Sequence, residues 1–226
     1  MTLAQSAAEA FEKYTAALSA DLLVQSSWHK EIDGRQLACG LGVLGDEITS
    51  ASKCPAKIMP RWLAQMVPWF FDNQDFDAAK AWGLRFYAEL KRLDGKVPFS
   101  VVYDWQSNFV CQLGVDAAVK HNRDPGPHKA LADMHGKALA GEKFSADEWK
   151  AVLKPANANA YAYADADADA DAYAYAYAYA YANANAYADA YAYANAYAYA
   201  YAYDKRRVAI KRLADGIVTC LQRVAI

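Results

Sequence analysis

The feature that most constrains this chain is a strict two-residue alternation in one internal segment. Every even-numbered position from Ala156 to Ala202 is alanine, and every odd-numbered position from Asn157 to Tyr203 is tyrosine, aspartate or asparagine. Fourteen of the 17 tyrosines of the chain lie in this segment, residues 155–203, which we call the tract. A period of two matches a β-strand and does not match an α-helix.

The alternation sorts side chains only if the tract is extended. In a helix, every second residue points to all sides in turn, so no dry face forms. In a strand, the alanines share one side and the Tyr, Asp and Asn residues share the other. The tyrosine side includes four carboxylates that cannot be buried unpaired, at Asp165, Asp167, Asp169 and Asp171. The pattern therefore predicts strands with alanine inward and tyrosine outward.

The length of the tract requires it to fold back on itself. Fully extended, roughly 48 residues would span about 160 Å, which is far more than a small domain. We expect an alanine-cored β repeat, either a solenoid or a meander of short strands, with Asn and Asp at the turns. Two alternatives remain open. Alanine is the best helix former, so the tract could be one long helix, or it could be disordered.

Residues 1–154 have the pattern of a helical globular domain. One helix is predicted near residues 3–24, and another carries the apolar stripe of Trp82, Phe86 and Leu90. A capping box, Ser145 to Glu148, opens a short helix that Pro155 is expected to end. Short strands are expected near residues 35–37 and 98–103, and the densest apolar segment, residues 54–72, is predicted to be a core helix.

The last segment, residues 204–226, is predicted to be an amphipathic helix. Ile210, Leu213, Ile217 and Cys220 keep a spacing of three and four residues. The whole chain is therefore predicted to be an α+β protein with three parts: a mainly helical domain (1–154), the β repeat (155–203) and a C-terminal helix (204–226).

Composition excludes several classes of protein. The formal net charge is −2, so the chain is no polycation for nucleic acid. No stretch approaches the roughly 18 apolar residues of a membrane span, and the first residues lack the pattern of a signal peptide. The cysteines are scattered without a C-x-x-C pair, which favours reduced thiols. We therefore expect a cytoplasmic protein.

Two short patterns could mark a catalytic or binding site. Gly40, Gly42 and Gly45 match G-x-G-x-x-G, but no acidic residue follows near position 65, so close packing is the better interpretation. His121, His128 and His135 are seven residues apart, about 10.5 Å along a helix, which is too far for one metal ion. These histidines are expected to be solvated or to cap helices.

The cysteines offer no better site. Cys39 with His29, or Cys111 with His121, could form a nucleophile and base, but buried structural cysteines are expected instead. No catalytic, cofactor-binding or metal-binding residue is predicted, and no cofactor is expected.

The predicted interaction surface is the outward tyrosine side of the tract. Such a ladder would exceed the apolar patch that a monomer normally exposes, which is roughly 300–600 Å². Self-association or binding of a partner protein is therefore one hypothesis, and a spacer without a binding role is the other. The tract has no Lys or Arg, so nucleic acid is an unlikely partner. The predicted contact residues are Tyr173, Tyr175, Tyr177, Tyr179, Tyr181, Tyr197, Tyr199 and Tyr201.

Two runs carry a resemblance to a known group of proteins. SWHKEIDGRQLACGLGVLGDE, followed by CPAKIMPRWLAQMVPWFFD, resembles uncharacterised phage and bacterial proteins. These combine a Trp…Cys-x-x-Gly-x-Leu region with an alanine-rich low-complexity run and a closing helix. The resemblance implies no activity and transfers no functional residue. The function predicted is thus a non-enzymatic accessory protein that associates through the tract. The alternative is a small enzyme or enzyme inhibitor in residues 1–154, with the tract as a spacer.

Overall fold

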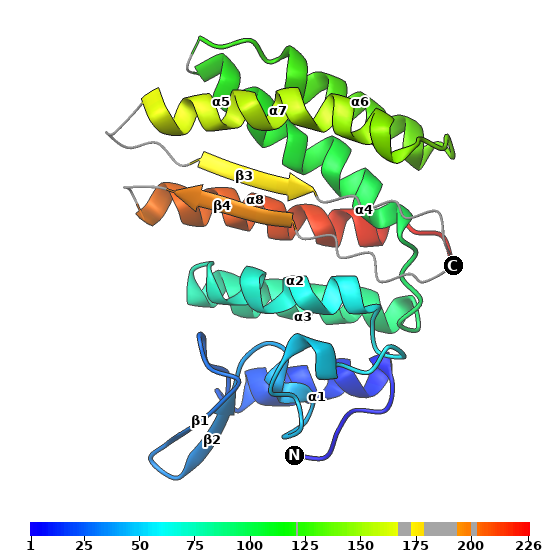
Figure 1. Cartoon of the computed structure of the whole chain (residues 1–226). Helices are drawn as coiled ribbons and strands as arrows, with labels where there is room; N and C mark the ends of the chain where they lie inside the picture. Colours follow the sequence, from blue (N-terminus) through cyan, green and yellow to red (C-terminus); the bar gives the residue numbers. More distant parts are fainter. Residues whose placement is uncertain (121, 167–172, 179–193, 200–202) are drawn as a thin grey trace. The chain divides into compact units, whose positions relative to one another are not determined.

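The chain folds into two compact, mainly helical units. The computed structural model describes residues 1–120, 122–166, 173–178, 194–199 and 203–226, and the side chains of residues 1–120, 122–157 and 207–226. Unit 1 comprises residues 1–98 and 218–226, and unit 2 comprises residues 99–217. The strands in these ranges form two separate antiparallel pairs (Figure 1). The division at residues 154 and 203 stays a prediction.

The predicted α+β fold with an alanine-cored β solenoid or meander is wrong. The described tract residues contribute the end of helix α7 (Ala146–Ala166) and one antiparallel pair, β3 (Tyr173–Ala178) with β4 (Ala194–Tyr199). One strand pair among these residues makes no solenoid coil. The tract begins as helix because α7 is already nucleated at Ser145, and alanine then extends it at low cost. Pro155 lies inside α7 and does not end it.

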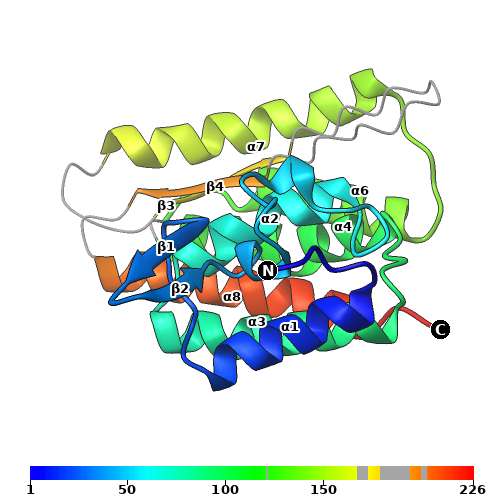
Figure 2. The same ribbon diagram turned by 90° about the horizontal axis from the view of Figure 1, so that it is seen from below.

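Unit 1 is built around helix α3 (Phe76–Arg92), which contacts α1 (Ala7–Ser19) and α2 (Arg61–Asp72) (Figure 2). The predicted apolar stripe of α3 is confirmed, since Trp82, Phe86 and Leu90 are all fully buried. The rings of Trp82 and Phe86 stack with centroids 4.9 Å apart.

The tightest approach between α1 and α3 is at Gly83. The Tyr14 ring of α1 lies against this glycine, so a Cβ atom added there would stand 2.1 Å from the Tyr14 Oη. The same hydroxyl donates a hydrogen bond to the Lys80 carbonyl at 3.0 Å, and the ring lies 4.9 Å from that of Tyr87. Only glycine permits this contact at position 83.

Helix α1 is shorter than the pattern predicts. Ser6 caps its start by accepting a hydrogen bond from the Glu9 amide, and the chain turns at Asp21, whose φ is 52°. The next residues are extended, and the Val24 amide donates to the Ala38 carbonyl at 3.0 Å. The residues after Asp21 therefore contribute to a small sheet rather than to the helix.

The strand expected near residues 35–37 is confirmed. It is β2 (Arg35–Ala38), and it pairs with β1 (His29–Ile32) in a hairpin. The two turn residues, Asp33 and Gly34, have φ values of 51° and 72°. Two consecutive positive φ angles in an Asp-Gly pair are typical of the tight turn whose twist suits a hairpin.

The dense apolar segment 54–72 lies in the core, as predicted, but only its second part, α2, is helical, and residues 54–60 form turns. Ile58, Met59, Leu63, Phe70 and Phe71 are fully or almost fully buried. Burial of such side chains stabilises by about 1.5–3 kcal/mol each, so this segment supplies much of the stability of unit 1. Because these side chains are buried in the core, neither a membrane nor a partner surface is needed to explain the hydrophobicity of the segment.

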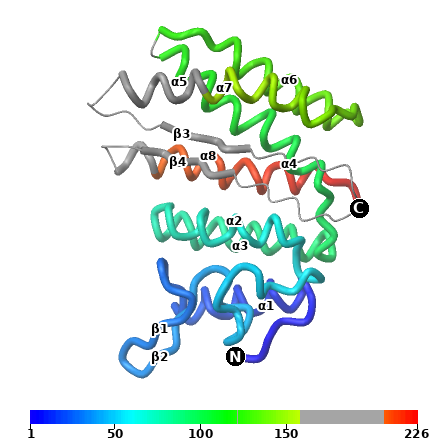
Figure 3. The backbone as a smooth tube through the Cα atoms, viewed as in Figure 1, coloured from blue at the N-terminus to red at the C-terminus, as the bar shows by residue number. Residues whose placement is uncertain are grey.

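Unit 2 begins with a helix where a strand was expected. Helix α4 (Ser100–Trp105) occupies most of the predicted strand 98–103, which is therefore wrong. A π-helical segment (Gln106–Val110) and α5 (Cys111–Lys120) continue the same helical rod, which packs on α6 (Gly126–Leu139) (Figure 3). Val101 and Trp105, four residues apart, are both buried, so the helical period takes precedence over the strand propensity of the valines.

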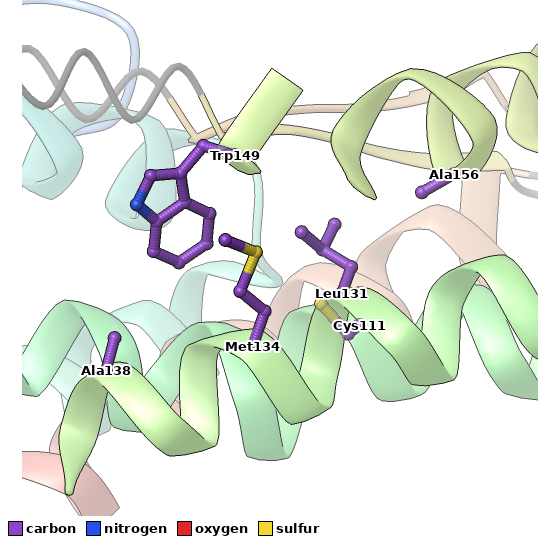
Figure 4. Packing of buried hydrophobic residues seen from close by; sticks show 6 residues of the cluster. All are labelled: Cys111, Leu131, Met134, Ala138, Trp149 and Ala156. Atoms are coloured by element: carbon purple, nitrogen blue, oxygen red, sulfur yellow. The ribbon is translucent and has the colours of Figure 1, made fainter. Parts of the chain in front are cut away.

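The core of unit 2 also includes α7, which lies on α6. Figure 4 shows Trp149 of α7 beside the Met134 side chain of α6, with Leu131 further along α6 toward Ala156. The buried members of this cluster are Cys111, Leu131, Met134, Ala138, Trp149 and Ala156.

The capping box at the start of α7 is confirmed, and it leads to a testable prediction. The Glu148 amide donates to Ser145 Oγ at 3.3 Å, while Glu148 Oε2 accepts from the Ser145 amide at 2.7 Å. We expect Ser145→Ala to lower the free energy of unfolding by about 1 kcal/mol, because an amide at the helix start loses its acceptor. Urea unfolding followed by circular dichroism measures the loss. Ser145→Asp, which can also cap, should stay close to the parent protein.

The last helix, α8 (Tyr203–Gln222), belongs to both units. Its residues Ile210, Leu213, Ala214 and Ile217 are buried in unit 2. Beyond Ile217 it joins unit 1, where the Arg92 guanidinium donates to the carbonyls of Leu221 at 2.6 Å and Val224 at 3.0 Å. Arg92 thereby satisfies carbonyls that the end of a helix leaves without partners.

Candidate functional site

The predicted tyrosine residues fall on the strand pair and on segments outside the described residues. Tyr173, Tyr175 and Tyr177 belong to β3, and Tyr197 and Tyr199 belong to β4. The other predicted residues lie outside the described residues: Tyr179, Tyr181 and Tyr201.

In the register of β3 and β4, alanine is opposite alanine, and tyrosine is opposite tyrosine at two positions. Tyr173 is opposite Tyr199, and Tyr175 is opposite Tyr197, while each alanine of β3 is opposite an alanine of β4. Tyr177 is the exception among the tyrosines, since it is opposite Asn195. Directly opposite positions of an antiparallel pair lie on the same side of the sheet. The register therefore keeps tyrosine positions on one side of the strand pair and alanine positions on the other.

Both helices that bound the tract are anchored in unit 2. On α7, the side chains of Trp149 and Ala156 are buried. On α8, the backbone carbonyl of Leu213 accepts a 2.8 Å hydrogen bond from Trp105 Nε1. Arg212 of α8 also forms a 2.6 Å ion pair with Asp116 of α5. Both ends of the tract are thus held by helices that are anchored in the same unit.

Two basic residues in the middle of α8 are used within the fold. Lys211 pairs with Asp215 at 2.5 Å, and Arg212 pairs with Asp116. Both lie more than two turns from the first residue of α8, so the dipole of the helix end has little effect on them. An external acidic partner is not needed to explain these two residues.

A second notable feature is a group of rings around one buried histidine in unit 2. The ring of His135 on α6 lies 4.8 Å from that of Trp149 on α7 and 6.1 Å from that of Tyr103 on α4. Tyr103 and Trp149 are themselves stacked at 6.2 Å, and Phe144 meets Trp149 edge-on at 5.8 Å. We call Tyr103, His135, Phe144 and Trp149 the His135 cluster.

His135 is held neutral by its surroundings. It is 1% exposed, and neither ring nitrogen has a hydrogen-bond partner among the described residues. Burial lowers the pKa of His135 to about 4, because the charged form loses its hydration. A buried neutral imidazole cannot reach a substrate in solution, so this cluster is an internal feature and not an exposed catalytic base.

The expectation that the histidines are solvated or cap helices is wrong for two of them. His128 and His135 are both buried on α6, and burial lowers the pKa of His128 as well. They face different neighbours, since His128 lies close to Gly114 of α5. His121 lies outside the described residues. In the parts of the chain that are described, no group of three His, Cys, Asp or Glu residues could hold a metal ion.

The glycines of the G-x-G-x-x-G match are packed against the protein itself. A Cβ atom would stand 2.6 Å from the Phe71 ring at Gly40, 2.2 Å from the Trp28 carbonyl oxygen at Gly42 and 2.7 Å from Leu3 Cα at Gly45. A phosphate-binding loop needs its glycines open to a ligand. The spacing here serves close packing, as interpreted from the sequence.

The four cysteines are buried, and none of them forms a disulfide with another described residue. Burial raises the pKa of the Cys39 thiol above its usual value, and it raises those of Cys54 and Cys111 to about 12. A thiol with a raised pKa is protonated at neutral pH and is a poor nucleophile. Cys39 also accepts a hydrogen bond from the Gly42 amide at 3.3 Å, which fixes it in the loop.

Sequence reasoning missed the π-helical segment and the His135 cluster. A signal for His135 was present, since it follows Leu131 by four residues and precedes Ala138 by three, on the buried stripe of α6.

Gln106, at the start of the π-helical segment, is 1% exposed and its Oε1 lacks a hydrogen-bond partner among the described residues. Nothing in the local sequence marks this extra residue in the helix.

Comparison with known proteins identifies no family for this chain. None of the helices in the described ranges has the length and apolar character needed to cross a membrane. No protein-family model, curated protein or solved structure matches the chain.

Proposed function

We propose that the protein is a non-enzymatic association protein whose tract binds a second copy of the chain or a partner protein. In this proposal the helical units hold the tract, and its tyrosine positions form the binding side. The resemblance to phage and bacterial proteins adds the context of an accessory protein in the cytoplasm of a host cell. Four buried cysteines without a disulfide among the described residues are compatible with that reducing compartment.

The register of β3 and β4 is the observation that carries this proposal. Tyrosine positions are matched across the pair at Tyr173–Tyr199 and Tyr175–Tyr197, and neither strand contains a charged residue or proline. A two-stranded pair is at best marginally stable in water unless it packs on other elements, and of these two strands β3 lies near α5 and α7. Contact with a second protein surface would stabilise the pair, and charged residues that normally prevent such contacts are missing from these two strands.

The anchoring of α7 and α8 further supports a binding role. Closing a flexible loop costs free energy that grows only with the logarithm of its length, so unit 2 tolerates a long tract between two fixed ends. In general, a segment fixed at both ends has less conformational freedom to lose on binding than a tail attached at one end.

The proposal is tested by replacing residues 161–200 with a Gly-Ser linker of equal length, which leaves Trp149, Ala156 and the buried part of α8 in place. We expect the parent chain to associate in a concentration-dependent way and the linker variant to remain monomeric in light scattering. A second variant with serine at the eight predicted tyrosine positions keeps the tract length and should also lose association.

Association that survives unchanged in the linker variant would contradict the proposal. A catalytic or inhibitory activity that the linker variant retains would instead favour an enzyme or inhibitor in the helical part, with the tract as a spacer. Circular dichroism provides the control that both helical units remain folded in the variants.

A further inference from the structure

The amino-terminal half of α7 is held in unit 2 mainly by the His135 cluster. Trp149 is 5% exposed and packs on the rings of His135, Tyr103 and Phe144. In the part of α7 whose side chains are described, only Ala156 is buried to the same degree. Val152 and Leu153 are half-buried. The aromatic contact of Trp149 is therefore the largest buried contact of this half of α7, and Val152 and Leu153 add smaller ones.

The other elements around α6 are fixed more firmly. Helix α4 buries Val101, Val102 and Trp105, and the Trp105 indole is also hydrogen-bonded to α8. The π-helical segment is tied to α6 by a 2.9 Å hydrogen bond from Ser107 Oγ to the Ala132 carbonyl. Among the α-helices of unit 2, α7 has the fewest buried side chains in its described part, so it is the helix that we expect to leave first if unit 2 opens locally.

The groups near His135 offer no counter-charge to an imidazolium. From α4 it meets the Tyr103 phenol, whose pKa burial raises. The α5 residue in the buried cluster that includes Trp149 is Cys111, a thiol whose pKa is about 12. Asp104 of α4 is hydrogen-bonded to Asn108, and the π-helical segment has no ionisable side chain. The acidic groups at the start of α7 are exposed and engaged, Asp147 with Lys150 and Glu148 with Ser145. The remaining ionisable groups on the described α6 are His128, Lys129, Asp133 and Lys137.

We propose that His135 makes the docking of α7 sensitive to acid, so that protonation of its ring releases the first half of α7 from α4 and α6 while the other helices of unit 2 stay folded. Once α7 leaves, the ring is open to water and the charge is hydrated. Since α7 leads directly into the tract, its release also frees the first of the two anchors of the tract.

The direction and size of the effect follow from linkage. With α7 docked, His135 has a pKa of about 4, and with α7 released its pKa returns toward the ordinary value of 6.5. Above pH 6.5 both states are neutral and docking is complete. As the pH falls below 6.5 the released state takes up the proton, so the opening equilibrium rises about tenfold per pH unit and levels off below about 4, a total of about 300-fold.

Hydrogen exchange of the full chain, followed by mass spectrometry between pH 7 and 4 and corrected for the intrinsic exchange rate, tests the proposal. We expect amides of residues 146–157 to lose protection by about tenfold per pH unit below pH 6.5. Peptides from α4, α6 and α3 should keep their protection over this range.

Two matched variants assign the effect to His135. His135→Phe keeps a ring of similar size without nitrogens, and its α7 protection should not depend on pH. His128→Gln removes the other buried histidine of α6, which lies against α5, and should retain the response of α7. Loss of protection that is equal in all helices, or that persists in His135→Phe, would overturn the proposal, as would an α7 that stays protected down to pH 4.

Discussion

Gly83→Ala is expected to lower the free energy of unfolding by about 3 kcal/mol, although alanine is the better helix former. The added methyl group would stand 2.1 Å from the Tyr14 Oη, so the Tyr14 ring or α1 must move. Movement also endangers the hydrogen bond from Tyr14 to the Lys80 carbonyl and the contact with Tyr87. Urea unfolding at neutral pH measures the loss.

Gly136→Ala is the matched control for this substitution. Gly136 also lies inside a helix, α6, but its nearest neighbour to an added Cβ atom is Ser107 Oγ at an ordinary 3.5 Å. The same chemical change should therefore stabilise the protein by roughly 0.5–1 kcal/mol through helix propensity alone. Equal effects of the two substitutions would refute the close approach of α1 and α3.

Trp105→Ala should be still more damaging, with an expected loss of about 4 kcal/mol. Trp105 is 1% exposed and holds α4 to α8 within unit 2 through its 2.8 Å hydrogen bond to the Leu213 carbonyl. Alanine leaves a large cavity and removes that bond. Thermal and urea unfolding measure the effect, and exchange of the α8 amides shows whether the helix loosens there first.

Trp105→Phe separates the two contributions. Phenylalanine fills most of the cavity but cannot donate to Leu213, so we expect a loss of about 2 kcal/mol. If Trp105→Ala costs less than about 1 kcal/mol, α8 does not depend on this contact.

Local patterns predicted the elements whose stability is local. The stripe of Trp82, Phe86 and Leu90 repeats with the helical period, and the capping box at Ser145 lies within one turn. Asp33-Gly34 supplies the two positive φ angles of a hairpin turn. In each case the residues that decide the structure are within a few positions of one another, so the sequence alone contains the necessary information.

Other elements depend on contacts between distant residues, and there the sequence was misleading. The valines near position 101 favour a strand in isolation, but burial of Val101 and Trp105 on one face selects a helix. Pro155 is a helix breaker in general, yet α7 continues through it. The alternation of the tract sorts residues on strands, and it says nothing about how many strands form. A single described pair replaced the expected repeat.

The candidate sites divide in the same way. The tyrosine positions of β3 and β4 could be identified from the alternation, whereas their pairing partners depend on the register, which every shift by two residues would satisfy almost equally well. The His135 cluster joins α4, α6 and α7, so its rings are brought together only by tertiary packing. The lowered pKa of His135 follows from that packing, so it could not be assigned from the sequence.

The shared helix α8 has a consequence for synthesis of the protein. Unit 1 consists of residues 1–98 and 218–226, so its first and last segments are separated by all of unit 2 and the tract. A ribosome must therefore translate the whole low-complexity region before Cys220, Leu221 and the carbonyls bound by Arg92 become available to the amino-terminal part. Translation that stops or loses its reading frame within the repeats would leave the nascent amino-terminal unit without its closing segment.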